Sequence, residues 1–277
     1  MSEFTDALRV SGAVRLADID PAATPGSAGS KREGAAALEE GGARLAALQE
    51  RLFAASRGGG TRAALLIVQG MDTSGKGGIM RHVVGQVDPQ GVAIRAFKAP
   101  TEEERAHDFL WRIERALPGP GMLGVFDRSH YEDVLIHRVR GLSAPAEVES
   151  RYGRIVAFEQ GLLDRGIEVV KVMLHISREE QGARLLERLD RPEKHWKYNP
   201  GDVDERQEWD AYMEAYEVAI ERTGIAVPWH VVPADRKWFA RLAVQELLIE
   251  ALERIDPRWP EADFDVAAER ERLLATG

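Results

Sequence analysis

The chain has 277 residues, a net charge of −9 and no cysteine. This length suits one α/β domain with extensions. The lack of cysteine excludes disulfides and thiolate zinc sites. The acidic balance argues against a nucleic-acid partner, because nucleic-acid-binding domains are usually basic. No apolar segment has the length of a signal sequence or a membrane span, so we expect a cytoplasmic enzyme without a membrane partner.

The N-terminal part of the chain is expected to be peripheral. Residues 21–30 are rich in Pro, Gly, Ser and Ala, which is typical of a linker, so we assign residues 1–32 to an N-terminal extension and linker. Short apolar groups at 14–16 and 19 could dock on the core. Residues 33–56 carry leucines at roughly helical spacing and are followed by glycines, which predicts a helix that ends there.

After this helix, strand-like and helix-like segments alternate. Strands are expected near 63–69, 92–97, 122–126, 168–175 and 229–232. Helices are expected near 76–87, 102–117, 130–140, 146–165, 178–190, 204–223 and 236–254. Such alternation indicates an α/β fold, with a parallel five-stranded sheet sandwiched by helices. We assign 33–260 to this single domain and 261–277 to a charged C-terminal tail, which we expect to cap the surface or to form an oligomer contact.

The segment after the first expected strand, residues 70–78, has the sequence Gly-Met-Asp-Thr-Ser-Gly-Lys-Gly-Gly. A strand, a glycine-rich loop with a lysine and then a helix form a phosphate-binding loop. Its backbone N–H groups point at an anion, and the lysine adds a positive charge. The candidate phosphate-binding residues are Gly70, Thr73, Ser74, Gly75, Lys76, Gly77 and Gly78. The alternative is a tight glycine-rich turn without a ligand.

One position of this loop departs from the usual pattern. The residue after the loop lysine is normally Ser or Thr, whose hydroxyl binds Mg²⁺, whereas here it is Gly77. Either the loop binds no metal or other groups hold it. Asp72, inside the loop, is the obvious candidate.

A second group of candidates follows the third expected strand. Asp127 ends that strand, where P-loop enzymes place an Asp that helps to hold Mg²⁺. The alternative is that Asp127 caps the helix that begins near Ser129. Arg128 can bind phosphate oxygens or form an ordinary ion pair. Glu132 is a candidate nucleotide contact, although an acidic residue at a helix N-terminus is also explained by the helix dipole.

Residues 184–197 combine five basic and three acidic side chains in a protein that is acidic overall. Three of them, Arg184, Arg188 and Arg191, are spaced to share one face of a helix, which a proline would then end. We interpret residues 182–203 as a mobile lid that brings basic side chains onto phosphates, as nucleotide kinases require. The alternative is a solvated, salt-bridged helix, which is the usual nature of a charge run.

Four further basic residues, Arg81, His82, Arg95 and Lys98, lie on the helix after the loop or near the end of the second expected strand. Because ligands gather at the carboxyl ends of parallel strands, these side chains could follow an extended phosphate chain. The alternative is that each is a surface charge. The aromatic residues at 209–216 have helical spacing, so we expect them in the core.

Six segments of the chain together resemble the type-2 polyphosphate kinase family, and the resemblance runs approximately from Arg15 to Pro260. The segments are the loop 70–78, Phe-Lys-Ala-Pro-Thr at 97–101, His-Asp-Phe-Leu-Trp-Arg at 107–112, Phe-Asp-Arg-Ser-His-Tyr-Glu-Asp-Val at 126–134, Arg-Leu-Asp-Arg-Pro-Glu-Lys-His-Trp-Lys at 188–197 and Pro-Ala-Asp-Arg-Lys-Trp at 233–238. The resemblance implies a P-loop kinase fold with a helical lid. It also implies Mg²⁺-dependent phosphoryl transfer between inorganic polyphosphate and nucleotides, with Mn²⁺ as the alternative metal.

The resemblance further implies roles for individual residues. Asp72 and Asp127 would hold the metal, which accounts for the glycine at position 77. Family members that accept both nucleoside mono- and diphosphates often have Asp at this position. Phosphates would be held by the loop lysine and by basic lid residues. We therefore place Lys76, Arg128 and Arg188 beside the two aspartates as catalytic candidates. The phosphate- or nucleotide-binding candidates outside the loop are Arg81, Lys98, Glu132, Arg191, Lys194 and Lys197.

The form Tyr-Glu-Asp-Val at 131–134 resembles the subgroup that accepts nucleoside mono- and diphosphates. AMP and ADP are therefore the expected acceptors, with GMP and GDP as further candidates, and we expect a homo-oligomer, a dimer or a tetramer. The acceptor's terminal phosphate is already anionic near neutral pH, so the reaction needs positioning and charge neutralisation rather than a strong base. Two other functions stay open: an ATP-dependent nucleotide or nucleoside kinase, and a non-catalytic polyphosphate-binding protein.

Overall fold

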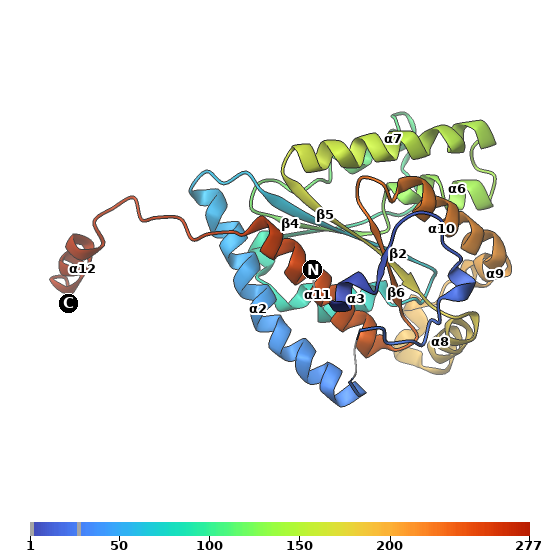
Figure 1. The fold of residues 1–277 in the computed structure, drawn as a ribbon, viewed down its shortest axis with the longest axis horizontal. Coiled ribbons are helices and arrows are strands. Elements are labelled where there is room, and N and C mark those ends of the chain that lie inside the picture. The colour runs from blue at the N-terminus through green and yellow to red at the C-terminus, as the bar shows by residue number, and fades with distance from the viewer. Residues whose placement is uncertain (1–2, 27–28) are drawn as a thin grey trace.

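The computed structural model describes residues 3–26 and 29–277, which contain a six-stranded sheet in the order β1-β6-β5-β2-β4-β3 (Figure 1). The strands are β1 (Arg9–Val10), β2 (Ala63–Gly70), β3 (Val92–Ala96), β4 (Leu123–Asp127), β5 (Ile167–His175) and β6 (Trp229–Pro233). Strands β2 to β6 are parallel to one another, which confirms the α/β fold and the five expected strands. The additional strand β1 pairs antiparallel with β6 at the edge. Its two residues are too few for a sequence pattern to reveal.

Strand β2 lies at the centre of the sheet and leads into the phosphate loop. All of its residues are buried, as expected for a parallel strand with helices on both faces. Val68 of β2 pairs with Asp127 of β4, and Gly70 pairs with Leu174 of β5. This register places the carboxyl end of β4 beside the start of the phosphate loop.

Helices cover both faces of the sheet, and a hydrophobic cluster fills the space on each side (Figure 1). The helices of one layer are α2 (Lys31–Arg57), α3 (Lys76–His82) and α11 (Lys237–Ile255). The main helices of the other layer are α7 (Pro145–Asp164) and α10 (Trp209–Thr223). The aromatic residues Trp209, Tyr212 and Tyr216 belong to the cluster beneath α10, which confirms their expected place in the core.

The N-terminal extension packs against the core, as expected for the apolar residues at 14–16 and 19 of this otherwise peripheral segment. Leu8 and Leu16 are both buried in this segment. Residues 27–28 of the expected linker lie outside the described residues, and Ser30 then caps α2 and forms a capping box with Glu33. The elements of the segment are α1 (Glu3–Asp6), β1 and the 3-10 turn Leu16–Asp18.

Four of the expected helices are interrupted in the structure. The expected helix at 102–117 is divided because Asp108 accepts hydrogen bonds from Leu110 N (3.0 Å) and Trp111 N (2.9 Å) and so begins a new turn. The expected helix at 76–87 is α3 followed by the 3-10 turn Val84–Gln86, and that at 102–117 is α4 (Glu102–Arg105) and α5 (Trp111–Glu114). The expected helix at 130–140 is the 3-10 turn His130–Asp133 and α6 (Ile136–Val139), and that at 204–223 is α9 (Gly201–Gln207) and α10. The remaining elements are α8 (Arg178–Asp190), as expected at 178–190, and the 3-10 turns Pro89–Gly91 and Pro192–Lys197.

The C-terminal tail extends away from the rest of the molecule (Figure 1). It contains α12 (Val266–Leu274), and every residue from 258 onward is exposed. The tail therefore does not cap the surface of its own chain, which was one of the two expectations. An oligomer contact stays a prediction.

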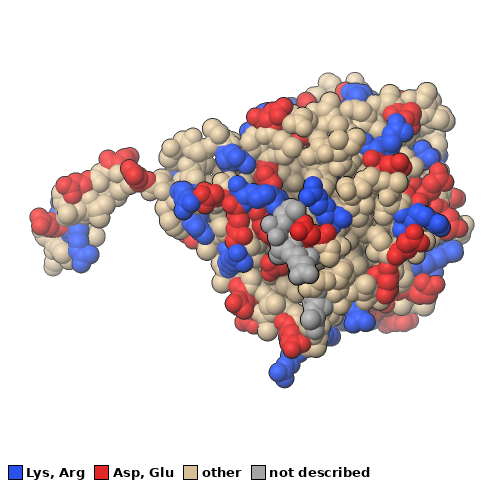
Figure 2. Space-filling model, viewed as in Figure 1, with Lys and Arg blue, Asp and Glu red and all other residues tan. Residues whose placement is uncertain are grey.

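Basic and acidic side chains are interspersed over the face that Figure 2 shows, and the tail carries both signs. A mixed surface of this kind produces no extended field of one sign. Within residues 3–26 and 29–277, no helix is long and apolar enough to cross a membrane.

Candidate active site

The loop between β2 and α3 has the strained backbone expected of a functional loop. Gly70, Thr73 and Gly75 have φ angles of 149°, 62° and 120°, and a non-glycine residue such as Thr73 rarely adopts a positive φ. A Cβ atom at Gly70 would lie 2.8 Å from the carbonyl oxygen of Leu174 and 2.7 Å from Ser74 Oγ. Glycine is therefore required at position 70 by both conformation and space.

Two hydroxyl groups of this loop are buried without a partner. Among the described residues, Thr73 Oγ1 and Ser74 Oγ make no hydrogen bond. Lys76 begins α3, and its Nζ donates to the carbonyl oxygens of Gly70 (2.7 Å) and Met71 (3.2 Å). Buried polar atoms normally have partners, so the unused hydroxyls beside a lysine suit an anion with several acceptor oxygens.

Arg184 of α8 holds the loop in place. Its guanidinium is buried and donates to the carbonyl oxygens of Thr73 (2.9 Å) and Ser74 (3.2 Å). It also donates to the carbonyl oxygens of Ala234 (2.8 Å) and Asp235 (2.9 Å), after β6. The sequence had suggested a lid role for Arg184, but these four bonds tie it to two loops.

Asp72 and Arg128 form an ion pair at the carboxyl ends of β2 and β4. Arg128 Nη2 lies 2.9 Å from Asp72 Oδ1, and Arg128 has a φ of 64°. Burial opposes ionisation of Asp72, but the charges of Lys76 and Arg128 outweigh it and lower the pKa of the carboxyl. Asp72 is therefore an anion in a predominantly basic site.

Asp127 does not cap the turn that follows it. Ser129 occupies the cap position, and its Oγ accepts a hydrogen bond from Tyr131 N (3.2 Å). The capping interpretation of Asp127 is therefore wrong. Asp127 lines the same cavity as Asp72 and Lys76, as the parallel register of β2 and β4 requires.

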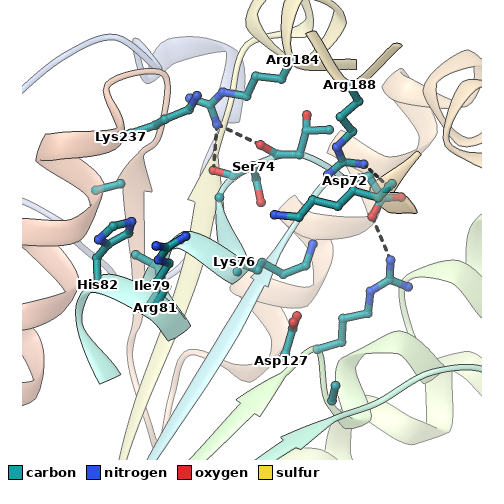
Figure 3. A pocket seen from close by; sticks show the side chains of 18 of the residues that line it. Asp72, Ser74, Lys76, Ile79, Arg81, His82, Asp127, Arg184, Arg188 and Lys237 are labelled. Carbon is teal, nitrogen blue, oxygen red and sulfur yellow. Dashed lines mark hydrogen bonds and ion pairs between the residues drawn. The ribbon is translucent and has the colours of Figure 1, made fainter. Parts of the chain in front are cut away.

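A cavity of about 910 Å³, here called the basic cavity, opens at the phosphate loop (Figure 3). Its ten basic side chains far outnumber its three acidic ones, Asp72, Asp127 and Glu187. The basic side chains are Lys76, Arg81, Lys98, Arg128, Arg184, Arg188, Lys194, Lys197, Lys237 and Arg241. In a protein of net charge −9, this concentration of positive charge defines a site for a polyanion.

A second pocket of about 190 Å³, here called the acidic pocket, adjoins the basic cavity. Asp72 and Arg128 line both. The polar side chains that line the acidic pocket alone are Glu132, Asn199, Asp202, Glu205, Tyr212 and Tyr216. Burial raises the pKa of Glu132, although Arg128 and Lys76 oppose this shift.

The segment from the end of α8 to α9 covers the site. Arg188 Nη1 donates to the carbonyl oxygen of Lys197 (2.9 Å) and to Asp202 Oδ2 (3.0 Å), so it connects α8 to α9. Arg188, Lys194 and Lys197 line the basic cavity. These three expected lid residues therefore lie close to the phosphate loop.

Two expected basic candidates lie away from the cavity lining. Arg191 forms ion pairs with Glu187 (3.2 Å) and Glu193. Helical spacing failed for Arg191 because α8 ends one residue before it and Arg191 has an extended backbone. Arg95 lies near Glu104 (3.6 Å), whereas Arg81, His82 and Lys98 do line the cavity.

Two basic residues were missed by the sequence analysis. Lys237 and Arg241 of α11 both line the basic cavity. Lys237 lies in a segment that carried the family resemblance, but no pattern in the sequence connected α11 with the phosphate loop. Only the packing of α11 on α3 reveals that connection.

A buried strand, a glycine-rich loop with its lysine, an acidic residue on the neighbouring strand and a basic covering segment together define a P-loop phosphotransferase of the kinase type. Comparison with known proteins agrees with this class. The family model of Polyphosphate kinase 2 matches residues 28–260. The chain belongs to the polyphosphate kinase 2 family, as the motifs had indicated.

Individual relatives match most of the chain. An AMP/ADP-polyphosphate phosphotransferase of Meiothermus ruber is 42% identical over 253 residues, which cover 91% of this chain and 93% of that protein. An ADP-polyphosphate phosphotransferase of Rhodopseudomonas palustris is 43% identical, covering 83% and 82%. The crystal structure of Polyphosphate Kinase 2 from Arthrobacter aurescens TC1 has a TM-score of 0.96 and 56% identity, covering 99% of this chain and 97% of that one.

Proposed function

We propose that this enzyme transfers phosphoryl groups from inorganic polyphosphate to AMP and ADP, with GMP and GDP as further acceptors. The observation that carries the proposal is that Asp72 and Arg128 line both the basic cavity and the acidic pocket. A donor in one and an acceptor in the other would meet at these two residues. The name of the Meiothermus relative supports polyphosphate with AMP and ADP, and that of the Rhodopseudomonas relative supports polyphosphate with ADP.

The basic cavity suits the donor. Polyphosphate carries negative charge along its whole length, so many basic side chains can bind it at once. The unpartnered hydroxyls of Thr73 and Ser74 offer further donors to phosphate oxygens. Lys76 already donates to backbone oxygens at the base of the loop and lies within reach of such a ligand.

The acidic pocket suits the nucleoside part of the acceptor. Carboxylates such as Glu132 and Glu205 accept hydrogen bonds from ribose hydroxyls or base amino groups, and Asn199 can donate or accept. The rings of Tyr212 and Tyr216 add apolar surface for a planar base. Glu132 lines this pocket together with Asp72 and Arg128, and there it would contact the nucleotide.

The residues present fit a magnesium ion. Mg²⁺ usually binds through one or two carboxylates, with the remaining positions filled by water and substrate phosphates. Asp72 and Asp127 supply two carboxylates in one cavity, and no cluster of three or more acidic or histidine ligands occurs within the described ranges. Such an ion would neutralise charge on the transferring phosphoryl group. Mn²⁺ prefers the same oxygen ligands and is the alternative.

The chain's own residues supply positioning and charge. The acceptor phosphate is the nucleophile and is already anionic, so we assign no general base. Lys76, Arg128 and Arg188 would neutralise the transferring group as charge spreads over its oxygens. The segment 182–203 would act as a lid, because its Arg188, Lys194 and Lys197 line the basic cavity and its closure would exclude water.

The direct test is incubation of the purified chain with polyphosphate, Mg²⁺ and one of AMP, ADP, GMP or GDP, with products separated by chromatography. We expect ADP and ATP from the adenine nucleotides. A parallel series with ATP as the only donor separates this function from an ATP-dependent kinase, which would be active there and inert with polyphosphate. Binding of polyphosphate without turnover would instead indicate a non-catalytic binding protein.

A homo-oligomer, dimer or tetramer, is part of the same proposal. The exposed tail supports it, because Phe264, Val266, Leu273 and Leu274 present apolar side chains to solvent. A nine-residue helix such as α12 is marginal in isolation. Light scattering of the full chain, and of a chain that ends at residue 260, would measure the assembly and the contribution of the tail.

A further inference from the structure

Four basic residues, Arg81 and His82 of α3 and Lys237 and Arg241 of α11, gather at one end of the basic cavity. We call them the distal cluster. Figure 3 shows Arg81, His82 and Lys237 to the left of Lys76, whereas Asp127 lies below it. The guanidinium of Arg241 lies 3.9 Å from the place that a Cβ atom at Gly78 would occupy, so it borders the phosphate loop directly.

The distal cluster has no acidic partner. Among the described residues, no ion pair or hydrogen bond joins the side chain of Arg81, Lys237 or Arg241 to a carboxylate, whereas Arg188, Arg191 and Lys194 all have one. Lys237 and Arg241 lie one helical turn apart, where like charges repel. The cluster therefore contains more positive charge than its own surroundings neutralise.

The pKa values of two members support this view of the cluster. Burial, Arg184 and Arg81 lower the pKa of Arg241. Burial also lowers the pKa of Lys237, and Arg184 and Lys194 add to the effect while Glu187 and Glu180 oppose it. An anion bound in this place would relieve the mutual repulsion.

We propose that Arg81, Lys237 and Arg241 form a distal subsite that binds the phosphates of the polyphosphate chain beyond its reacting end, and that this subsite sets the preference for long chains. The inference rests on the proposed function. With the reacting end at Asp72 and Asp127, a chain that continues across the loop past Lys76 reaches the distal cluster. A short chain ends before it.

A polyphosphate chain fits this place better than a nucleotide. The apolar residues that line the cavity beside the cluster are Ile79 and Ala240, which offer no hydrogen-bond partner to a base or ribose. Every unit of polyphosphate carries charge, so the part far from the reaction can still bind basic side chains. Contacts that are equally strong in the ground and transition states lower KM rather than raise kcat, and we assign the distal contacts to this kind.

The test compares tripolyphosphate with length-fractionated long polyphosphate at saturating ADP. In the variant Lys237→Met/Arg241→Met we expect KM for long chains to rise by about tenfold or more, because two charge-assisted contacts are lost. KM for tripolyphosphate and both kcat values should stay within about twofold of wild type. The charge-keeping variant Lys237→Arg/Arg241→Lys should restore most of the long-chain affinity.

Arg254→Met is the matched control, because Arg254 lies on the same helix but pairs with Glu168 away from the cavity. It should leave both KM values unchanged. Equal rises of KM for short and long chains would overturn the distal subsite and place these cations at the reacting end. No change for either substrate would also overturn it.

Binding of the same polyphosphates without nucleotide, measured by calorimetry, separates failure of the subsite from failure of the proposed function. If wild type does not use polyphosphate of any length as a donor, the proposed function is wrong. The distal subsite then also fails as a determinant of substrate length. If wild type turns over long and short chains and the double variant binds both as wild type does, only the subsite is wrong.

Discussion

Lys171 Nζ lies 2.6 Å from Glu159 Oε2, and both side chains are fully buried. Tyr131 joins them: its hydroxyl accepts from Lys171 (2.8 Å) and donates to Glu159 (2.7 Å). Burial opposes the charge of Glu159, but Lys171 outweighs it and lowers the pKa of the carboxyl. Tyr131 belongs to the 3-10 turn His130–Asp133, which follows Arg128, so the buried pair holds this turn in place.

Removing only one member of the buried pair Lys171–Glu159 should strongly destabilise the protein. Lys171→Met leaves Glu159 buried without its counter-ion, so we expect the free energy of unfolding to fall by about 3–5 kcal/mol. The double variant Lys171→Met/Glu159→Leu should lose less, because it removes both charges together. Denaturant unfolding of wild type, the single variants Lys171→Met and Glu159→Leu, and the double variant measures this. Additive losses would show that the two side chains are not coupled.

The metal assignment predicts the behaviour of Asp127→Asn. Loss of one carboxylate should lower kcat by about 100-fold or more, the usual scale for a preorganised charge at the reacting group. Stability should change little, because Asp127 does not cap the following turn. Turnover is measured over a range of Mg²⁺ concentrations. A variant that keeps wild-type turnover with Mg²⁺ would remove Asp127 from the metal site.

Two glycines of the phosphate loop predict opposite outcomes. Gly70→Ala should destabilise the loop and abolish most activity, because its φ is 149° and its Cβ would collide with backbone at Leu174. Gly77→Ser should fold normally, because nothing lies within 4 Å of its Cβ position. Thermal melts and kcat values of both variants test this. If Asp72 and Asp127 hold the metal, the new hydroxyl is not needed, and Gly77→Ser should leave the Mg²⁺ requirement unchanged.

We expect a contrast between two arginines of the segment 182–203. Arg184→Met removes four hydrogen bonds to two loops, so we expect losses in both melting temperature and kcat. Arg191→Met should stay close to wild type, because Arg191 is half exposed and bonds only to neighbouring acidic residues. Melting curves and KM for polyphosphate compare the two. A large rise of KM in Arg191→Met would return this residue to the binding site.

The parts of this molecule that could be predicted are those with a local pattern. The apolar runs gave all five parallel strands, and the strand–loop–helix pattern placed Lys76 and Asp127 together because parallel strands bring their carboxyl ends to one edge. The break at Asp108 depends on one capping side chain, which spacing rules do not register. The extended backbone of Arg191 follows from Pro192, because the residue before a proline is disfavoured in the helical conformation.

Other features depend on segments that are distant in sequence. Arg184 and Lys237 reach the phosphate loop only because α8 and α11 pack beside it. Strand β1 exists because Arg9 and Val10 find a partner in β6, and two residues carry no periodic signal. Tertiary contact decides all of these positions.

The environment of His230 in β6 predicts that the stability of the protein depends on pH. Burial lowers the pKa of His230 from 6.5 to about 4, although its hydrogen bond to Lys171 O opposes this change. Between these two pKa values the unfolded chain binds more protons than the folded one, so stability falls as the pH is lowered from 6.5 towards 4. The free energy of unfolding changes by at most about 1.4 kcal/mol for each pH unit within that window.

The variant His230→Asn keeps a side-chain N–H donor and does not titrate. The stability of wild type relative to this variant should therefore decrease as the pH is lowered from 6.5 towards 4, and it should stay constant between pH 7 and 8. Denaturant unfolding at several pH values measures the difference, and a difference that does not change with pH would show that His230 titrates normally in the folded protein.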